Sequence, residues 1–161
     1  MSRKALEGIK VLDFGWVMVG ALTGKHLGDH GAQVIRVESL TRPCPLRGDR
    51  QISISKASNP DDKPVFTWQN TSKYSITINL KHPRSREVID RLIQWADVVN
   101  ENFTPGTMTK LGLDYEYMCK IKPDIVMTSC SAFGQTGPLA REWGLDGSAL
   151  TLSGRLYLSG W

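Results

Sequence analysis

The chain has 161 residues, of which 40% are apolar and 22% are charged. This length suits one domain with a buried core, and the composition is that of an ordinary folded protein rather than a disordered one. Lysine and arginine number 20 against 16 acidic residues, which gives a net charge of +4. Since the basic residues form no tract, we expect no nucleic-acid partner; the charge suits either an anionic small ligand or an ordinary protein surface.

No apolar run approaches the roughly 18 residues that a membrane span needs, so we expect no membrane association. Residues 1–8 carry one basic pair without the apolar stretch of a secretory signal, which predicts a cytoplasmic protein. The three cysteines, Cys44, Cys119 and Cys130, are odd in number and show no CxxC spacing. This pattern argues against a disulfide framework and against a structural zinc site, and it favours reduced thiols.

The first third of the chain has the pattern of a βαβ unit. An apolar run over residues 9–14, interrupted by Asp13, predicts a buried strand. A helix is expected over 19–30 and a second strand over 33–38. Residues 41–63 are rich in proline and polar residues and predict a long loop.

The rest of the chain continues this alternation. We predict a strand over 74–80, a helix over 83–96 and a strand over 97–101. After the break at Pro105-Gly106, two short helices are expected before Lys122, followed by a strand over 124–129 and a last helix over about 145–154. Strands that alternate with helices predict an α/β fold with a doubly wound, mostly parallel, Rossmann-like sheet and helices on both faces.

Three glycines at four-residue spacing mark the first helix. Gly20, Gly24 and Gly28 fall on one helical face, where missing side chains let the helix lie close to the sheet, and Gly31 is expected to end the helix in a left-handed conformation. The spacing does not match GxGxxG. A glycine turn between a strand and a helix favours a ligand with phosphate or acyl groups, but tight packing alone would require the same glycines.

Few residues suggest chemistry of their own. His26 and His30 could face a metal, but Leu27 stands where a zinc protease has glutamate, so we expect solvent-facing histidines and no metal. Cys130 follows a predicted strand and is either a nucleophile or plain core. No GxSxG motif is present, which argues against a serine hydrolase.

Polar residues gather at the predicted strand ends and loops. They are Asn70, Thr71, Ser72, Asn100 and Asn102. Such groups can hold an amide-rich phosphorylated ligand, and they are also ordinary turn formers. The residues by themselves therefore indicate an α/β domain with a possible site for a nucleotide-like anion.

Four segments in order resemble class III CoA-transferases, the family of formyl-CoA transferase, carnitine CoA-transferase and α-methylacyl-CoA racemase. They are LEGIKVLDFGWVMVGALTGKHLGDHGAQVIRVE, FTWQNTSKYSITINLKHP, DVVNENFTPGTMTKLGLDYE with its ENFxPG motif, and PDIVMTSCSAFGQTGP. The resemblance runs from Leu6 to about Gly154. It implies transfer of CoA from an acyl-CoA to a free carboxylic acid through an aspartyl mixed anhydride, with CoA thioesters as substrates and no covalently bound cofactor.

The resemblance also implies a set of CoA-binding residues. Met18 and Val19 match the turn near the thioester, and Gln69, Asn70, Thr71 and Ser72 match the turn at the adenosine-phosphate site. Asn102, Phe103 and Thr104 match the ENFxPG contact, and Lys110 stands where the family often has a phosphate-binding arginine. Trp143 to Asp146 match a segment that borders the thioester pocket.

Several positions depart from the family pattern. Ser39 replaces a frequent arginine, and Arg36 and Arg42 are the nearby candidates to take its place. Met18 stands where formyl-CoA transferases have glutamine, which disfavours formate and oxalate; Trp16 and Met18 favour a larger or more apolar acyl group. Gly144-Leu145-Asp146 replaces the Gly-His-Asp of the racemases, whose histidine moves a proton, so a transferase is favoured over a racemase.

The matched segments correspond to one part of the family's fold. We expect residues 1–161 to be the N-terminal portion of the CoA-binding domain, with the nucleophilic aspartate, the small domain and the C-terminal return segment absent and no turnover by this chain alone. Full-length relatives imply an interlocked homodimer or a related heteromer. The alternatives are a racemase of the same family and a non-catalytic CoA-binding module or inactive subunit.

Overall fold

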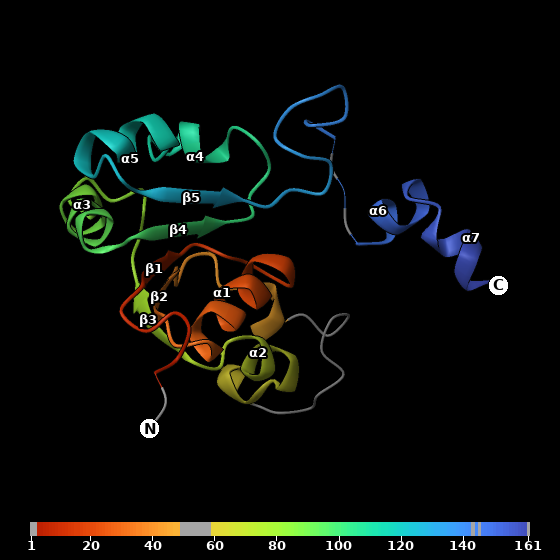
Figure 1. Cartoon of the computed structure of the whole chain (residues 1–161), viewed down its shortest axis with the longest axis horizontal. Coiled ribbons are helices and arrows are strands. Elements are labelled where there is room, and N and C mark those ends of the chain that lie inside the picture. The colour runs from red at the N-terminus through yellow and green to blue at the C-terminus, as the bar shows by residue number, and fades with distance from the viewer. Residues whose placement is uncertain (1–2, 49–58, 143, 145, 161) are drawn as a thin grey trace.

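A five-stranded parallel sheet forms the centre of the molecule (Figure 1). The computed structural model describes residues 3–48, 59–142, 144 and 146–160. The strands are β1 (Lys10–Asp13), β2 (Gln33–Glu38), β3 (Lys73–Thr77), β4 (Val98–Glu101) and β5 (Val126–Ser129). Their order is β3-β2-β1-β4-β5, and every neighbouring pair is parallel. This is the Rossmann order over five strands, so the predicted fold class is confirmed.

Helices cover both faces of this sheet. On one face lie α1 (Val19–Asp29) and α2 (Pro64–Gln69), and on the other lie α3 (Ser85–Trp95), α4 (Thr107–Lys110) and α5 (Tyr115–Ile121). Two 3-10 helices, η1 (Pro45–Arg47) and η2 (Pro60–Asp62), lie in the predicted long loop. The sequence did not indicate α2, because six residues are too few to show a helical period.

The core follows the alternation of side chains along the strands. Val11 and Leu12 are both fully buried, but successive side chains of a strand point to opposite faces. Val11 packs with Val34 and with Leu27 of α1. Leu12 belongs to a larger apolar cluster that includes Ile93 of α3. The sheet is therefore closed from both sides, as parallel sheets require.

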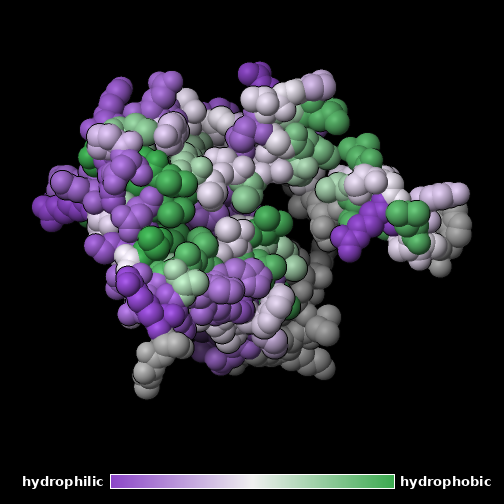
Figure 2. All heavy atoms as spheres, in the orientation of Figure 1, coloured by the Kyte–Doolittle hydropathy of each residue, from purple (hydrophilic) through white to green (hydrophobic). Residues whose placement is uncertain are grey.

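The C-terminal helices stand apart from the sheet. They are α6 (Asp146–Leu152) and α7 (Arg155–Ser159), of which α6 was predicted and α7 was not. Leu152, Leu156 and Leu158 are exposed on them, and Figure 2 shows apolar residues on this protruding segment. None of the helices in the described ranges is long and apolar enough to cross a membrane.

The glycine spacing of α1 has a packing reason. A Cβ on Gly24 would lie 2.3 Å from Asp13 Oδ2, and one on Gly20 would lie 2.4 Å from Asn102 Oδ1. Both distances are far below van der Waals contact, so only glycine fits at these points. Gly31 follows the helix with φ +109°, the left-handed conformation that was predicted for it.

Candidate functional site

The turn after β1 lies where the strand order of the sheet reverses, since β1 has β2 on one side and β4 on the other. Ligands of doubly wound sheets bind at such a point, beyond the carboxyl ends of the strands. One side chain from the end of β4 holds this turn. Asn102 Oδ1 accepts a hydrogen bond from the Trp16 N–H at 2.6 Å, and Asn102 Nδ2 donates to the Trp16 carbonyl at 2.9 Å. The backbone of Trp16 is thereby fixed on both sides of its Cα.

Apolar and aromatic side chains line this turn. The rings of Trp16 and Phe103 meet edge to face, with their centres 6.2 Å apart. Met18 and Val19 at the start of α1 are 45% and 60% exposed. Val17 has φ +52°, a conformation that costs a β-branched residue about 1–3 kcal/mol and that neighbouring contacts must offset. The turn therefore presents its side chains in a fixed arrangement.

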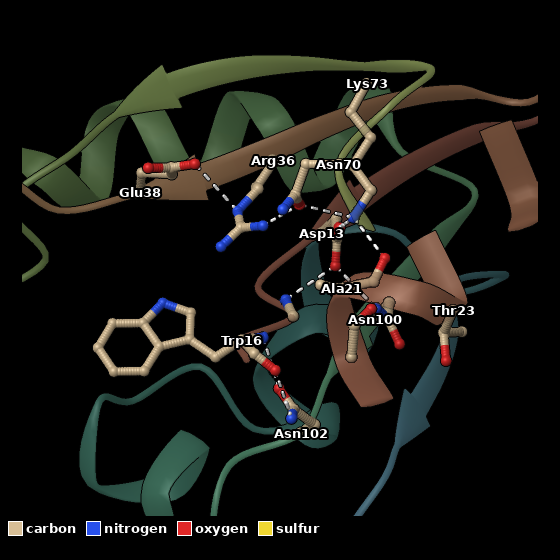
Figure 3. A network of polar contacts seen from close by, with 12 residues as sticks. Asp13, Trp16, Ala21, Thr23, Arg36, Glu38, Asn70, Lys73, Asn100 and Asn102 are labelled. Carbon is tan, nitrogen blue, oxygen red and sulfur yellow. Dashed lines mark hydrogen bonds and ion pairs between the residues drawn. The ribbon is translucent and has the colours of Figure 1, made fainter. Parts of the chain in front are cut away.

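A buried network of charges and amides lies beneath the turn (Figure 3). Asp13 is fully buried, and its carboxylate accepts from Lys73 Nζ at 2.9 Å and from Asn100 Nδ2 at 2.7 Å. Lys73 Nζ also donates to the Ala21 carbonyl at 2.6 Å, and Asn100 Nδ2 donates to the Gly20 carbonyl at 2.9 Å. The network thus ties the first turn of α1 to three strands.

Lys73 is a structural cation rather than a ligand-binding one. Its three N–H donors are used by Asp13, Ala21 and Asn70, and its side chain is 2% exposed. Burial lowers the pKa of the Lys73 ammonium below its ordinary value of 10.5; the Asp13 carboxylate opposes this shift, and the positive charge of Arg36 adds to it. The ion pair keeps a charged lysine in a site that otherwise disfavours it.

A second group of charges continues the network from the end of β2. Arg36 Nε lies 3.1 Å from Glu38 Oε1, and Arg47 donates two hydrogen bonds of 3.0 Å to the same carboxylate. Arg47 also pairs with Asp61 and lies over the ring of Phe66, 3.7 Å from its centre. These contacts fasten η1 and η2 to the sheet.

Three buried polar atoms have no hydrogen-bond partner among the described residues. They are Arg36 Nε, Arg36 Nη2 and Gln69 Oε1, on side chains that are 1% and 0% exposed. Arg36 Nε is at ion-pair distance from Glu38 without the geometry of a hydrogen bond. The other amide atom of Gln69, Nε2, lies 2.7 Å from Met18 Sδ. An unpaired buried polar group costs about 1–3 kcal/mol, so these atoms mark a place where a further polar group would be stabilised.

The structure brings together six of the residues predicted for a site. Met18 contacts Gln69 and is followed by Val19, while Asn102 and Phe103 hold the same turn from the other side. Asn70 takes part in the network, where its Oδ1 accepts from Arg36 and from Lys73.

Other predicted residues lie elsewhere. Thr71 and Ser72 precede β3, so they are at the amino edge of the sheet, where the Ser72 hydroxyl donates to Asp29 at 2.7 Å. Lys110 is exposed at the end of α4. Trp143 and Leu145 fall outside the described residues; Asp146 begins α6, but its side chain also falls outside them.

A separate hollow of about 160 Å³ lies beyond the ends of β4 and β5. Among the predicted site residues that the structure describes, Thr104 alone lines it, together with Glu101, Ser129 and Gln135. Glu101 is 3% exposed and accepts a hydrogen bond of 2.7 Å from the Phe103 N–H. That bond shapes the start of the ENFxPG loop.

The candidate metal and nucleophile residues have ordinary surroundings. His26 and His30 are exposed, as predicted, and His30 Nδ1 lies 2.8 Å from the His26 carbonyl oxygen. Within the described ranges, no three histidine, cysteine or acidic side chains gather as metal ligands would. Cys130 is half-buried, and its N–H donates to the Glu101 carbonyl at 2.9 Å.

Reasoning from the sequence missed the Asp13–Lys73 pair. A carboxylate inside the apolar run 9–14 was the available signal, because a charge in a buried strand needs a partner. Nothing in the sequence pattern identified Lys73 as that partner. Asn100 was noted as a strand-edge polar group, but it is fully buried and its amide serves the network.

Comparison with known proteins agrees with this arrangement. The chain is 36% identical over 159 residues to mouse succinyl-CoA:glutarate CoA-transferase. This match covers 99% of the chain and 35% of the mouse protein. It is 34% identical to the beta subunit of succinyl-CoA–L-malate CoA-transferase from Chloroflexus aurantiacus, covering 96% of the chain and 37% of that protein. The crystal structure of a CAIB/BAIF family protein from Brucella suis superposes with a TM-score of 0.83 at 34% identity, covering 95% and 40% of the two chains.

The chain thus spans between a third and two fifths of the length of these relatives. The sequence profile of CoA-transferase family III matches residues 6–161, which is nearly the whole chain. The strand order, the turn held by Asn102 and the ENFxPG loop all lie within that match. The chain therefore belongs to CoA-transferase family III.

Proposed function

We propose that residues 1–161 are the N-terminal portion of the CoA-binding domain of an acyl-CoA:carboxylate CoA-transferase. The family match over residues 6–161 is the observation that carries this proposal. Within the match, the turn at Trp16 is clamped by Asn102 at the point where the strand order reverses. A CoA thioester would lie across that turn, with Met18 and Val19 near its acyl end and Lys110 pairing with phosphate.

The nucleophile is proposed to come from outside this chain. Within the part of the chain that the structure describes, the buried carboxylates at the carboxyl edge of the sheet are those of Asp13 and Glu101, and both are already occupied. Asp13 accepts from Gly15, Lys73 and Asn100, and Glu101 accepts from the Phe103 N–H. A carboxylate held in this way cannot attack a thioester without breaking its own hydrogen bonds. An aspartate beyond residues 1–161 would form the mixed anhydride, so these residues alone should give no CoA exchange between an acyl-CoA and a free acid.

The bound ester needs protection and charge stabilisation. An acyl anhydride reacts with water, so the pocket must be closed while it exists. Backbone N–H groups near the reacting carbonyl would stabilise the oxyanion of each tetrahedral intermediate. The fixed turn after β1 contributes one wall of such a pocket, because its backbone is held by Asn102 rather than free to move.

The full protein is proposed to act as an interlocked homodimer or a related heteromer in the cytoplasm. The exposed leucines of α6 and α7 support an assembly that covers them. One relative is named as the beta subunit of a CoA-transferase, which supports the heteromeric form. Sedimentation of these residues alone at increasing concentration should show self-association through this surface; a monodisperse monomer would count against it.

Titration of CoA into the chain by calorimetry tests the proposed function. Unmodified CoA should bind, and Lys110→Glu should weaken it about tenfold, because the substitution replaces a phosphate-binding cation with a like charge. Lys120→Glu makes the same charge change on an exposed residue of α5 and should leave the affinity unchanged. If the unchanged chain did not bind CoA, the proposal would be wrong. If Lys110→Glu and Lys120→Glu bound CoA equally well, Lys110 would not belong to the site.

A further inference from the structure

An arginine that pairs with no acidic residue of the described ranges lies over the tryptophan of the clamped turn. The centre of the Arg42 guanidinium is 5.6 Å from the centre of the Trp16 ring. Arg42 is exposed, and no carboxylate in the described part of the chain lies within ion-pair distance of it. The other cations of the region are each paired, Arg36 with Glu38, Arg47 with Asp61 and Lys73 with Asp13.

The cation–π contact with the indole leaves the N–H donors of this guanidinium available. Arginine has five N–H donors, and a cation–π contact with a ring leaves these donors free to bind an acceptor. A carboxylate matches two of these donors at once. Arg42, held near Trp16, can therefore bind an anion with the geometry of a carboxylate.

The surroundings of Trp16 suit a short hydrocarbon chain that leads to such a carboxylate. Asn102 fixes Trp16 at the reversal of strand order, where the ligand of a doubly wound sheet binds. Met18 and Val19 are exposed next to it, and Phe103 closes its other edge. These side chains offer apolar contact to methylene groups and no polar group for their ends.

A second cation adds to the positive charge of this region. Arg36 Nη2 is buried and has no acceptor among the described residues, and in Figure 3 it points away from Asn70 and Lys73. Glu38 is shared between Arg36 and Arg47, so it cannot also neutralise Arg42. The local excess of positive charge favours an anionic group over a neutral one.

Resting on the CoA-binding function proposed above, we propose that Arg42 selects acyl groups that end in a second carboxylate. The thioester end would react, while the far carboxylate would bind the Arg42 guanidinium on Trp16. This narrows the expectation of a large acyl group, drawn from Trp16 and Met18, to the acyl groups of dicarboxylic acids.

Two thioether analogues of equal length test this selection. S-(3-carboxypropyl)-CoA and S-butyl-CoA differ only in the terminal carboxylate, and neither can hydrolyse or transfer its chain. In calorimetric titrations of the 161-residue chain, the carboxylate form should bind about tenfold more tightly, the gain expected of a charge-assisted bidentate contact near the surface. Arg42→Met should reduce this ratio to about one, and Arg42→Lys should keep part of it.

Controls separate this inference from the function on which it rests. Arg91→Met removes an exposed arginine from α3 and should leave the ratio unchanged. Equal binding of the two analogues, with CoA itself still bound, would overturn the selection and leave the CoA site standing. If Arg42→Met weakened CoA and both analogues by one common factor, Arg42 would be a phosphate contact and the inference would be wrong. If CoA did not bind at all, both proposals would fall together.

Discussion

The two faces of the sheet are built on different principles. The face under α3 and α5 is closed by an apolar cluster, in which Leu12, Ile89 and Ile93 are at most 1% exposed. The face under α1 buries an ion pair, Asp13–Lys73, almost as completely. Apolar burial stabilises without fixing one arrangement closely, whereas a buried charge is tolerated only when every partner is in place. The charged face therefore fixes the first turn of α1, and the apolar face supplies stability.

The largest effect is expected from Lys73→Met, which leaves Asp13 buried without its cation. We expect a loss of about 3–5 kcal/mol in the free energy of unfolding, measured by urea denaturation. Ile93→Ala on the apolar face should lose a comparable 2–5 kcal/mol or so through the cavity it creates. Only Lys73→Met should also weaken CoA, because it releases the Ala21 carbonyl and the first turn of α1.

The double variant Asp13→Asn with Lys73→Met keeps this comparison testable if the single variant does not fold. Removing both charges should restore part of the lost stability, because no uncompensated charge remains. If the Lys73→Met, double and Ile93→Ala variants all bound CoA with the same affinity, the buried ion pair would have no special role in positioning the site.

A smaller effect is expected from Gly24→Ala, which tests how closely α1 must approach the charged face. The added methyl carbon would lie 2.3 Å from Asp13 Oδ2 and 3.0 Å from Lys73 Nζ, so the helix or the ion pair must shift. We expect a loss of about 1–3 kcal/mol, read from thermal unfolding. Gly147→Ala in α6 meets no atom within 4 Å and should instead be neutral or stabilise by up to about 1 kcal/mol. If Gly24→Ala and Gly147→Ala changed the stability by the same amount, α1 would not need to approach the sheet closely.

The sequence predicted the frame of this site better than its interior. Apolar runs and turn residues located all five strands and the helix with three spaced glycines, because these signals are local. The glycine spacing even indicated a close approach of α1. It could not show what was approached, since Lys73 and Asp13 are 60 residues apart and meet only after β3 and β1 are aligned with β2 between them. Side-chain partners of that kind depend on register and helix placement, which no local pattern encodes.

The same limit explains the uneven result for the predicted site residues. Asn102 and Met18 follow strands and therefore reach the carboxyl edge, where the resemblance placed them. Ser72 precedes a strand, and the parallel arrangement carries it to the opposite edge. Asn70 lies between these cases, because its side chain extends back to Arg36 and Lys73. A motif read along the chain does not distinguish residues before a strand from residues after it.

The smallest effect should come from the exposed counterpart of the buried ion pair. Asp97 accepts from Lys122 Nζ at 2.8 Å and from the Lys10 N–H at 2.9 Å, and these hydrogen bonds hold its pKa below the ordinary value of 3.8. The unfolded carboxylate takes up a proton near that value and the folded one only at lower pH, so acid favours unfolding in this window. The contribution is present above pH 3.8 and is lost as the pH falls through the folded pKa. Because the Asp97 side chain is 39% exposed, solvent screening should keep the effect below about 1 kcal/mol.

Urea titrations from pH 5 to pH 3 should show a shallower loss of stability for Asp97→Asn than for the unchanged chain, with Asp124→Asn as the control for one lost negative charge. Identical slopes for the chain and Asp97→Asn would mean that an exposed pair contributes nothing, which would make the contrast with the buried pair sharper still.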